Sequence, residues 1–237
     1  MLSMNKNPTF KYSITTTVIF VLILWCIKSF EQIFAISFRD FGVNPAEFSG
    51  LIGILFAPLI HASYEHLASN SLPLLILGSV LFYGYPKSSK ITVGIIWFFS
   101  GLGVWLFARE SYHVGASGLT HGIFFYLLIT SILRRDNRSI ALMMIAFFMY
   151  GGMVLSILPR EQHISFEYHL FGAIAGIVCA VLFYKWDPKL ERKRYEWERE
   201  HEPDEPHGTW QGEEEDDLIG DEWKVDGADE QNQRHSR

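Results

Sequence analysis

Two short segments hold the residue types that nucleophilic catalysis requires. In HVGASGLTHG (113–122), Ser117 stands between Gly115 and Gly118, where a polar break gives way to a long apolar run. A serine at a helix N-terminus has unpaired backbone N–H groups beside it, and such groups can stabilise an oxyanion. On its own, G-x-S-G is more typical of small residues at a helix contact than of a catalytic site.

The second segment, EYHLFGAIAG (167–176), places His169 at the start of another apolar run. A neutral histidine is the usual base that activates a serine hydroxyl. The spacing Gly172-x-x-x-Gly176 favours close contact with a neighbouring helix. A lone histidine here would be more typical of a membrane-interface residue.

A third segment, HASYEHLASN (61–70), contains His61, His66 and Asn70. His66 and Asn70 are four residues apart, so they share one face of a helix that begins here. Both side chains can donate hydrogen bonds, which suits the stabilisation of an oxyanion. The same pattern also fits a hydrogen-bonded helix start near the headgroups, and His61 is better suited to holding the preceding loop.

The elements that carry these residues are long apolar runs separated by short polar breaks. Each run is near the length that crosses about 30 Å of hydrocarbon as a helix. A helix also satisfies its own backbone groups in lipid. The chain is therefore predicted to be an all-α polytopic membrane protein whose domain 1–185 holds six transmembrane helices, at about 14–36, 67–84, 91–108, 117–133, 139–158 and 168–184.

Basic residues predict the orientation of this domain. With the N-terminus inside, twelve Lys/Arg residues fall on the inner side and three, Arg39, Arg109 and Arg160, on the outer side. This bias predicts that both termini are cytoplasmic. Short loops and the absence of a targeting peptide indicate a bacterial inner membrane.

The orientation brings the candidate residues to one depth. The second, fourth and sixth spans then run from outside to inside, and His66, Asn70, Ser117 and His169 all lie where those spans begin. The outer side of the membrane is therefore predicted to hold a nucleophile, a base and two oxyanion donors together.

Two regions fall outside the spans. Segment 37–66 contains the apolar run 50–60, which is too short to cross and is predicted to be an interfacial loop. Residues 186–237 carry 8 Lys/Arg and 18 Asp/Glu, a net charge of −10, and are predicted to be a disordered cytoplasmic tail. No basic face with interleaved aromatic residues occurs, so nucleic acid is not expected as a partner.

Taken together, these motifs resemble the rhomboid family of intramembrane serine proteases over about residues 10–185. The resemblance implies a Ser117–His169 dyad without a carboxylate. It implies an oxyanion hole formed by His66, Asn70 and the backbone N–H of Ser117. His61 matches a further histidine of the family, in the loop before the second span.

The resemblance also assigns supporting roles. Gly172 and Gly176 match the close packing of the sixth span on the fourth, and Gly115 and Gly118 flank the serine. The chain departs from the family where residues 52–53 are Ile-Gly in place of a frequent Trp-Arg pair. It departs again at His121, where the family often has an aromatic residue that stacks on the catalytic histidine. His121 is predicted to be a substitute stacking partner, with a second base as the alternative.

The expected activity is hydrolysis of peptide bonds in or next to transmembrane segments of membrane proteins, with the lipid bilayer as the environment. Neither a cofactor nor a metal is expected, because no H-E-x-x-H occurs and His61-x4-His66 is not ligand spacing on a helix. The main alternative is a non-catalytic rhomboid-like protein that binds membrane helices. A transporter is disfavoured because no repeat relates the two halves.

Overall fold

The computed structural model describes residues 10–159 and 165–189, and within these ranges the chain forms helices and loops without a β-strand. The long helices are α1 (Phe10–Ile33), α3 (Tyr64–Gly84), α4 (Ser89–Phe107), α5 (Ser117–Arg134), α6 (Asn137–Tyr150) and α7 (Phe166–Phe183). The short ones are α2 (Gly53–Phe56) and the 3₁₀ turns η1 (Arg39–Phe41), η2 (Phe48–Ile52), η3 (Ala57–Leu59) and η4 (Gly151–Val154). The all-helical prediction is confirmed. The predicted tail, apart from residues 186–189, lies outside the described residues.

Five of these helices are long and apolar enough to cross a membrane: α1, α3, α4, α6 extended by η4, and α7. The predicted count of six is therefore not reached on these criteria. Helix α5 is long enough, with 18 residues. His121, Arg134 and several small polar residues lower its hydropathy, and most of its side chains are buried inside the bundle.

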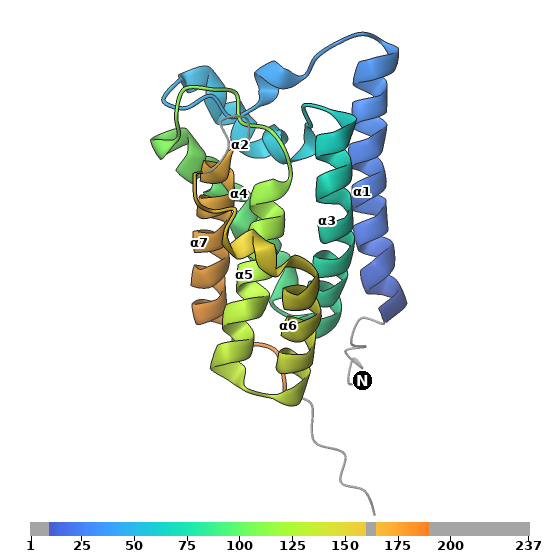
Figure 1. Ribbon diagram of the computed structural model, residues 1–237, viewed down its shortest axis with the longest axis vertical. Helices are drawn as coiled ribbons and strands as arrows, with labels where there is room; N and C mark the ends of the chain where they lie inside the picture. Colours follow the sequence, from blue (N-terminus) through green and yellow to red (C-terminus); the bar gives the residue numbers. More distant parts are fainter. Residues whose placement is uncertain (1–9, 160–164, 190–237) are drawn as a thin grey trace, which may run out of the picture. The chain divides into compact units, whose positions relative to one another are not determined.

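Helix α5 lies at the centre of the bundle, where it contacts α3, α4, α6 and α7 (Figure 1). Helix α1 lies outside this group and packs against α3. Large apolar side chains such as Ile19 and Leu22 on α1 face outward. An apolar outer surface is what a helix presents to lipid, whereas α5 finds its partners within the protein.

Side-chain caps define where two helices of the site begin. The Ser63 hydroxyl accepts a hydrogen bond from the His66 N–H at 3.0 Å, which starts α3. The Ser165 hydroxyl accepts one from the Tyr168 N–H at 3.3 Å, which starts α7. Such caps satisfy backbone donors that the first turn leaves free. They set where His66 and His169 enter their helices.

The opposite end of α5 is fixed by the buried side chain of Arg134. Its guanidinium donates to Asp136 Oδ2 at 2.8 Å and to the carbonyl oxygens of Tyr184 and Asp187 at 2.8 and 2.7 Å. The Asp187 carboxylate in turn accepts from the Ser88 hydroxyl at 2.5 Å. These bonds join the segment after α7 to the end of α5 and to the start of α4.

Segment 37–66 contains the short helices η1, η2, α2 and η3, none of which is long enough to cross a membrane. A Cβ added at Gly53 would lie 2.2 Å from the carbonyl carbon of Gly42, so backbone packs directly on backbone in this segment. The Ile52–Gly53 pair thus allows a close chain crossing that a larger second residue would prevent. The Ala57 carbonyl accepts a hydrogen bond from the Gly115 N–H at 2.9 Å and so ties the segment to the loop that precedes α5.

Candidate active site

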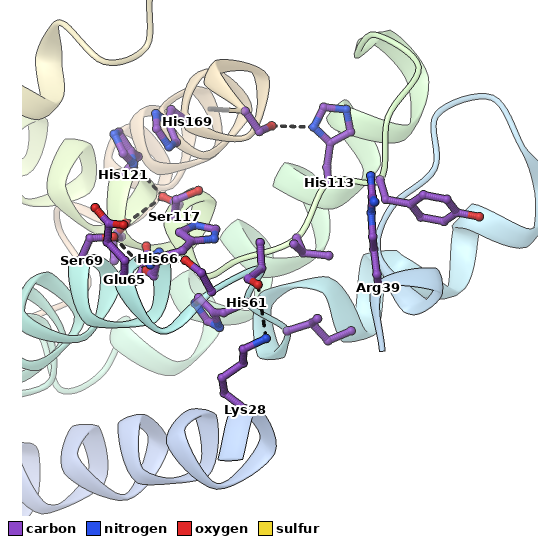
Figure 2. A pocket seen from close by; sticks show the side chains of 18 of the residues that line it. Lys28, Arg39, His61, Glu65, His66, Ser69, His113, Ser117, His121 and His169 are labelled. Atoms are coloured by element: carbon purple, nitrogen blue, oxygen red, sulfur yellow. Dashed lines mark hydrogen bonds between the residues drawn. The ribbon is translucent and has the colours of Figure 1, made fainter. Parts of the chain in front are cut away.

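Ser117 is the first residue of α5 and lines a cavity of about 920 Å³. His66, Asn70, His121 and His169 line the same cavity. Figure 2 shows Ser117 with the ring of His66 on one side and the rings of His121 and His169 on the other. The predicted catalytic and oxyanion-hole residues are therefore brought into one cavity by α3, α5 and α7.

The loop before Ser117 owes its path to Gly115, whose φ is +116°. Residues other than glycine rarely adopt this backbone conformation, and an added Cβ would lie 2.6 Å from Cε1 of His66. The glycine lets the loop pass directly against the His66 ring. One residue later, the Ala116 N–H donates to Nε2 of His61 at 3.4 Å.

His61 supports this loop as a neutral acceptor. It is almost fully buried, and its ring meets that of His66 edge to face with centroids 5.2 Å apart. Burial first, and the neighbouring His66 second, lower the pKa of His61 to about 3. The ring is thus uncharged at neutral pH and can accept the bond from Ala116.

Glycines on α5 and α7 bring His169 close to Ser117. A Cβ added at Gly172 would lie 2.1 Å from the Gly118 carbonyl oxygen, and one at Gly176 would lie 2.0 Å from that of Gly122. The two helices therefore pack with backbone against backbone along two turns. Only glycine permits this approach, which puts the first turn of α7 beside the first turn of α5.

The beginning of α7 is also held by His113, which sequence reasoning did not select. Its Nε2–H donates to the Arg109 carbonyl at 3.0 Å, so Nδ1 is left to accept from the Ser165 hydroxyl at 2.7 Å. Burial lowers the pKa of His113 and favours this neutral form. Ser165 is the cap of α7, and His113 therefore links the loop before Ser117 to the helix that carries His169.

The two rings of His121 and His169 are stacked, with centroids 3.9 Å apart and planes 9° apart. Nδ1 of His169 lies 3.0 Å from the carbonyl oxygen of Ser156. Nδ1 of His121 lies 2.7 Å from the carbonyl oxygen of Ser117, and its Nε2 lies 2.7 Å from the Ser156 hydroxyl. The Thr120 hydroxyl also donates to the Ser117 carbonyl, at 2.8 Å.

The candidate oxyanion donors occupy one face of α3. Asn70 is buried, and its Nδ2 donates to the His66 carbonyl at 2.9 Å. A carboxamide has two N–H donors, so one remains for a ligand in the cavity. The ring of His66 is half-buried between His61 and Gly115.

Several cavity residues were not selected from the sequence. Thr120 has no distinctive spacing, and neither does Ser156, which contacts both stacked rings. The charged residues that line the cavity belong to segments far apart in the chain: Lys28, Glu31, Arg39, Glu65 and Arg109. Lys28 forms an ion pair with Glu31 at 3.3 Å. In the part of the chain that the structure describes, no three His, Cys, Asp or Glu side chains are grouped so as to hold a metal ion.

Comparison with known proteins identifies the family of the chain. The Rhomboid domain family matches residues 49–186. An uncharacterised protein of Mycobacterium bovis is 33% identical over 186 residues, which cover 75% of this chain and 78% of that protein. An uncharacterised protein of Mycobacterium leprae is 31% identical over 176 residues, 70% of each chain.

A protein of Acanthamoeba polyphaga mimivirus, whose name assigns it provisionally to the rhomboids, is 31% identical over 145 residues, 57% of this chain and 77% of the viral protein. No solved structure matches the chain. The family match covers more than half of the sequence, and five apolar helices accompany it. The predicted resemblance is confirmed: the chain belongs to the rhomboid family and is an integral membrane protein.

Proposed function

We propose that the protein is an intramembrane serine endopeptidase that hydrolyses peptide bonds in or next to transmembrane segments of membrane proteins. Ser117 is the nucleophile and His169 is its base, and α5 also crosses the membrane, as the fourth of six spans. The proposal also places both termini in the cytoplasm and the site in the outer half of a bacterial inner membrane. The distribution of basic residues favours this orientation.

One observation carries the proposal: the hydrogen bond between His169 Nδ1 and the Ser156 carbonyl oxygen, at 3.0 Å. A carbonyl oxygen can only accept, so Nδ1 carries the proton in this bond. In the neutral ring Nε2 then has a free lone pair. This is the tautomer that a general base needs in order to take the proton of a serine hydroxyl.

The chemistry then follows the surroundings of Ser117. Its Oγ attacks the substrate carbonyl carbon while His169 Nε2 takes the hydroxyl proton. The oxyanion receives hydrogen bonds from the Ser117 N–H, the His66 ring and the second N–H of Asn70. His169 gives its proton to the leaving amine, and an acyl-enzyme remains. Water, deprotonated by His169, releases the acid and restores the serine.

The lining of the cavity also supports the supply of water to this reaction within the bilayer. Charged and polar side chains line it, among them Lys28, Glu65 and Arg109, and Ser117 lines the same cavity at the first turn of α5. Hydrolysis needs one water per bond. A cavity lined by polar and charged side chains can hold it beside Ser117.

The test is cleavage of a panel of single-span substrates by purified protein. Ser117→Ala and His169→Ala are each expected to abolish cleavage, and the double variant is expected to be no worse than either, because the two residues act as a unit. A fluorophosphonate should label the wild type at Ser117, and a chelator should have no effect.

Two outcomes would overturn the proposal. Substantial cleavage by Ser117→Ala would remove the serine mechanism. A wild-type protein that binds single-span helices but neither cuts them nor reacts with the fluorophosphonate would be the non-catalytic relative considered above.

A further inference from the structure

Ser156 contacts both stacked histidines, although it belongs to none of the sequence motifs. It lies in the turn after η4, at the end of α6. Its carbonyl oxygen is 3.0 Å from His169 Nδ1, and its hydroxyl is 2.7 Å from His121 Nε2. Ser156, which lies outside α5 and α7, is thus within hydrogen-bond distance of one histidine ring on each of these helices.

The acceptors around His121 determine where its proton lies. Nδ1 faces the Ser117 carbonyl oxygen at 2.7 Å and must carry a hydrogen. In the neutral ring Nε2 is then an acceptor, and the Ser156 hydroxyl must donate to it. The same hydroxyl is 2.9 Å from the Met153 carbonyl, but its single hydrogen can serve only one of these two acceptors.

The alternative arrangement has a charged His121. Nε2–H would then donate to the Ser156 hydroxyl, which would turn its hydrogen to Met153. Such a charge would lie in a ring stacked 3.9 Å from His169. In the proposed reaction His169 itself becomes positive, and two like charges at this distance oppose each other. Catalysis therefore requires the arrangement in which Ser156 donates to a neutral His121.

We propose that Ser156 is a positioning residue for catalysis: its hydroxyl keeps His121 neutral and oriented, and its carbonyl orients His169. This inference rests on the proposed protease function. His121 in turn holds the Ser117 carbonyl, so the hydroxyl of Ser156 is coupled to both members of the dyad. An imidazole, unlike a carbocyclic aromatic ring, has a second nitrogen, and in the neutral ring this nitrogen requires a donor.

Substitution of Ser156 separates the role of its hydroxyl from that of its carbonyl. Ser156→Ala leaves the carbonyl bond to His169 in place and removes the hydroxyl that lies within hydrogen-bond distance of His121 Nε2 and of the Met153 carbonyl. A buried acceptor that loses its partner should cost about 5- to 100-fold in kcat, with KM little changed. The rate of fluorophosphonate labelling at Ser117 should fall by a similar factor. Ser156→Thr, which retains a hydroxyl, should restore most of both rates.

A second substitution tests the partner. In a His121→Phe background the acceptor is gone, so Ser156→Ala should change kcat less than twofold further. Ser131→Ala is the matched control, because the Ser131 hydroxyl makes the same type of bond to the carbonyl three residues earlier, at 2.7 Å, away from the cavity. It should leave kcat unchanged. If Ser156→Ala is unstable in detergent, Ser156→Cys keeps the size and weakens the donor.

Each failure is distinguishable. Wild-type kcat and labelling in Ser156→Ala, with Ser117 still required, would overturn the positioning role alone. Equal losses in the alanine and threonine variants, or an undiminished effect of Ser156→Ala in the His121→Phe background, would also overturn it. Cleavage that survives Ser117→Ala would instead overturn the proposed function.

Discussion

The backbone contact between α5 and α7 predicts a large effect from one methyl group. In Gly172→Ala the new Cβ would start 2.1 Å from the Gly118 carbonyl oxygen, whereas ordinary contact begins at 3.4 Å. The neighbour is backbone within a helix and cannot turn aside, so the helices must separate by about 1.3 Å, the difference between these distances. Overpacking of this kind costs about 1–3 kcal/mol of stability.

The same displacement acts on the chemistry, because His169 lies one turn before Gly172. A misplacement of about 1 Å can cost about 100-fold in rate, so kcat should fall by about that factor while substrate binding changes less. The assay measures cleavage of one single-span substrate, fluorophosphonate labelling and thermal unfolding in detergent. Gly94→Ala is the matched control, since Gly94 lies within α4 and an added Cβ would meet nothing within 4 Å.

Gly94→Ala is expected to retain wild-type kcat and stability. The reasoning fails if Gly172→Ala also retains both, because α7 would then have room that the described packing denies. It fails equally if Gly172→Ala unfolds at a lower temperature but retains full kcat, since helix separation and the position of His169 would be unrelated.

Two further predictions concern the α3 side of the cavity. Asn70→Ala and His66→Ala should each lower kcat by about 10²–10³ with little effect on KM, as loss of one oxyanion donor does; unchanged kcat in both would limit these side chains to a role in starting the helix. The pKa of His61 is about 3 in the folded protein against 6.5 when unfolded. Neutral His61 should therefore contribute fully to the free energy of unfolding above pH 6.5, and this contribution should fall by up to about 1.4 kcal/mol per pH unit as the pH decreases below 6.5. Thermal unfolding between pH 7.5 and 4.5 should show this slope reduced in His61→Gln, and identical slopes would contradict it.

Apolar run length predicted most of the helices to within a few residues. The predicted span 67–84 corresponds to α3 at Tyr64–Gly84, and 168–184 corresponds to α7 at Phe166–Phe183. Run length works because a helix must match the hydrocarbon thickness. The clear difference is the predicted span 139–158, since α6 ends at Tyr150 and continues only as η4. The Gly151–Gly152 pair explains this early end, because glycine destabilises a helix.

That difference also explains why Ser156 was not found. If Ser156 were part of a continuous helix, as predicted, its position in the sequence would not relate it to His121 or His169. The early end of α6 turns the chain and brings its carbonyl to His169. The sequence could group Ser117, His169, His66 and Asn70 because each lies at the start of a predicted span and those spans are predicted to run in one direction. The contacts of Ser156 depend on this turn, and no regular residue spacing in the sequence indicates them.

The composition of α5 has a consequence for the order in which the protein assembles during synthesis. Two of its polar side chains have partners in segments that are translated later: His121 bonds to Ser156, and Arg134 bonds to Asp136, Tyr184 and Asp187. A nascent chain that stops before α7 has Asp136 for the guanidinium but lacks the Tyr184 and Asp187 carbonyls that also bind it. Synthesis of α7 and the segment that follows it therefore completes the hydrogen bonds of Arg134 and adds His169 to the cavity that Ser117 lines.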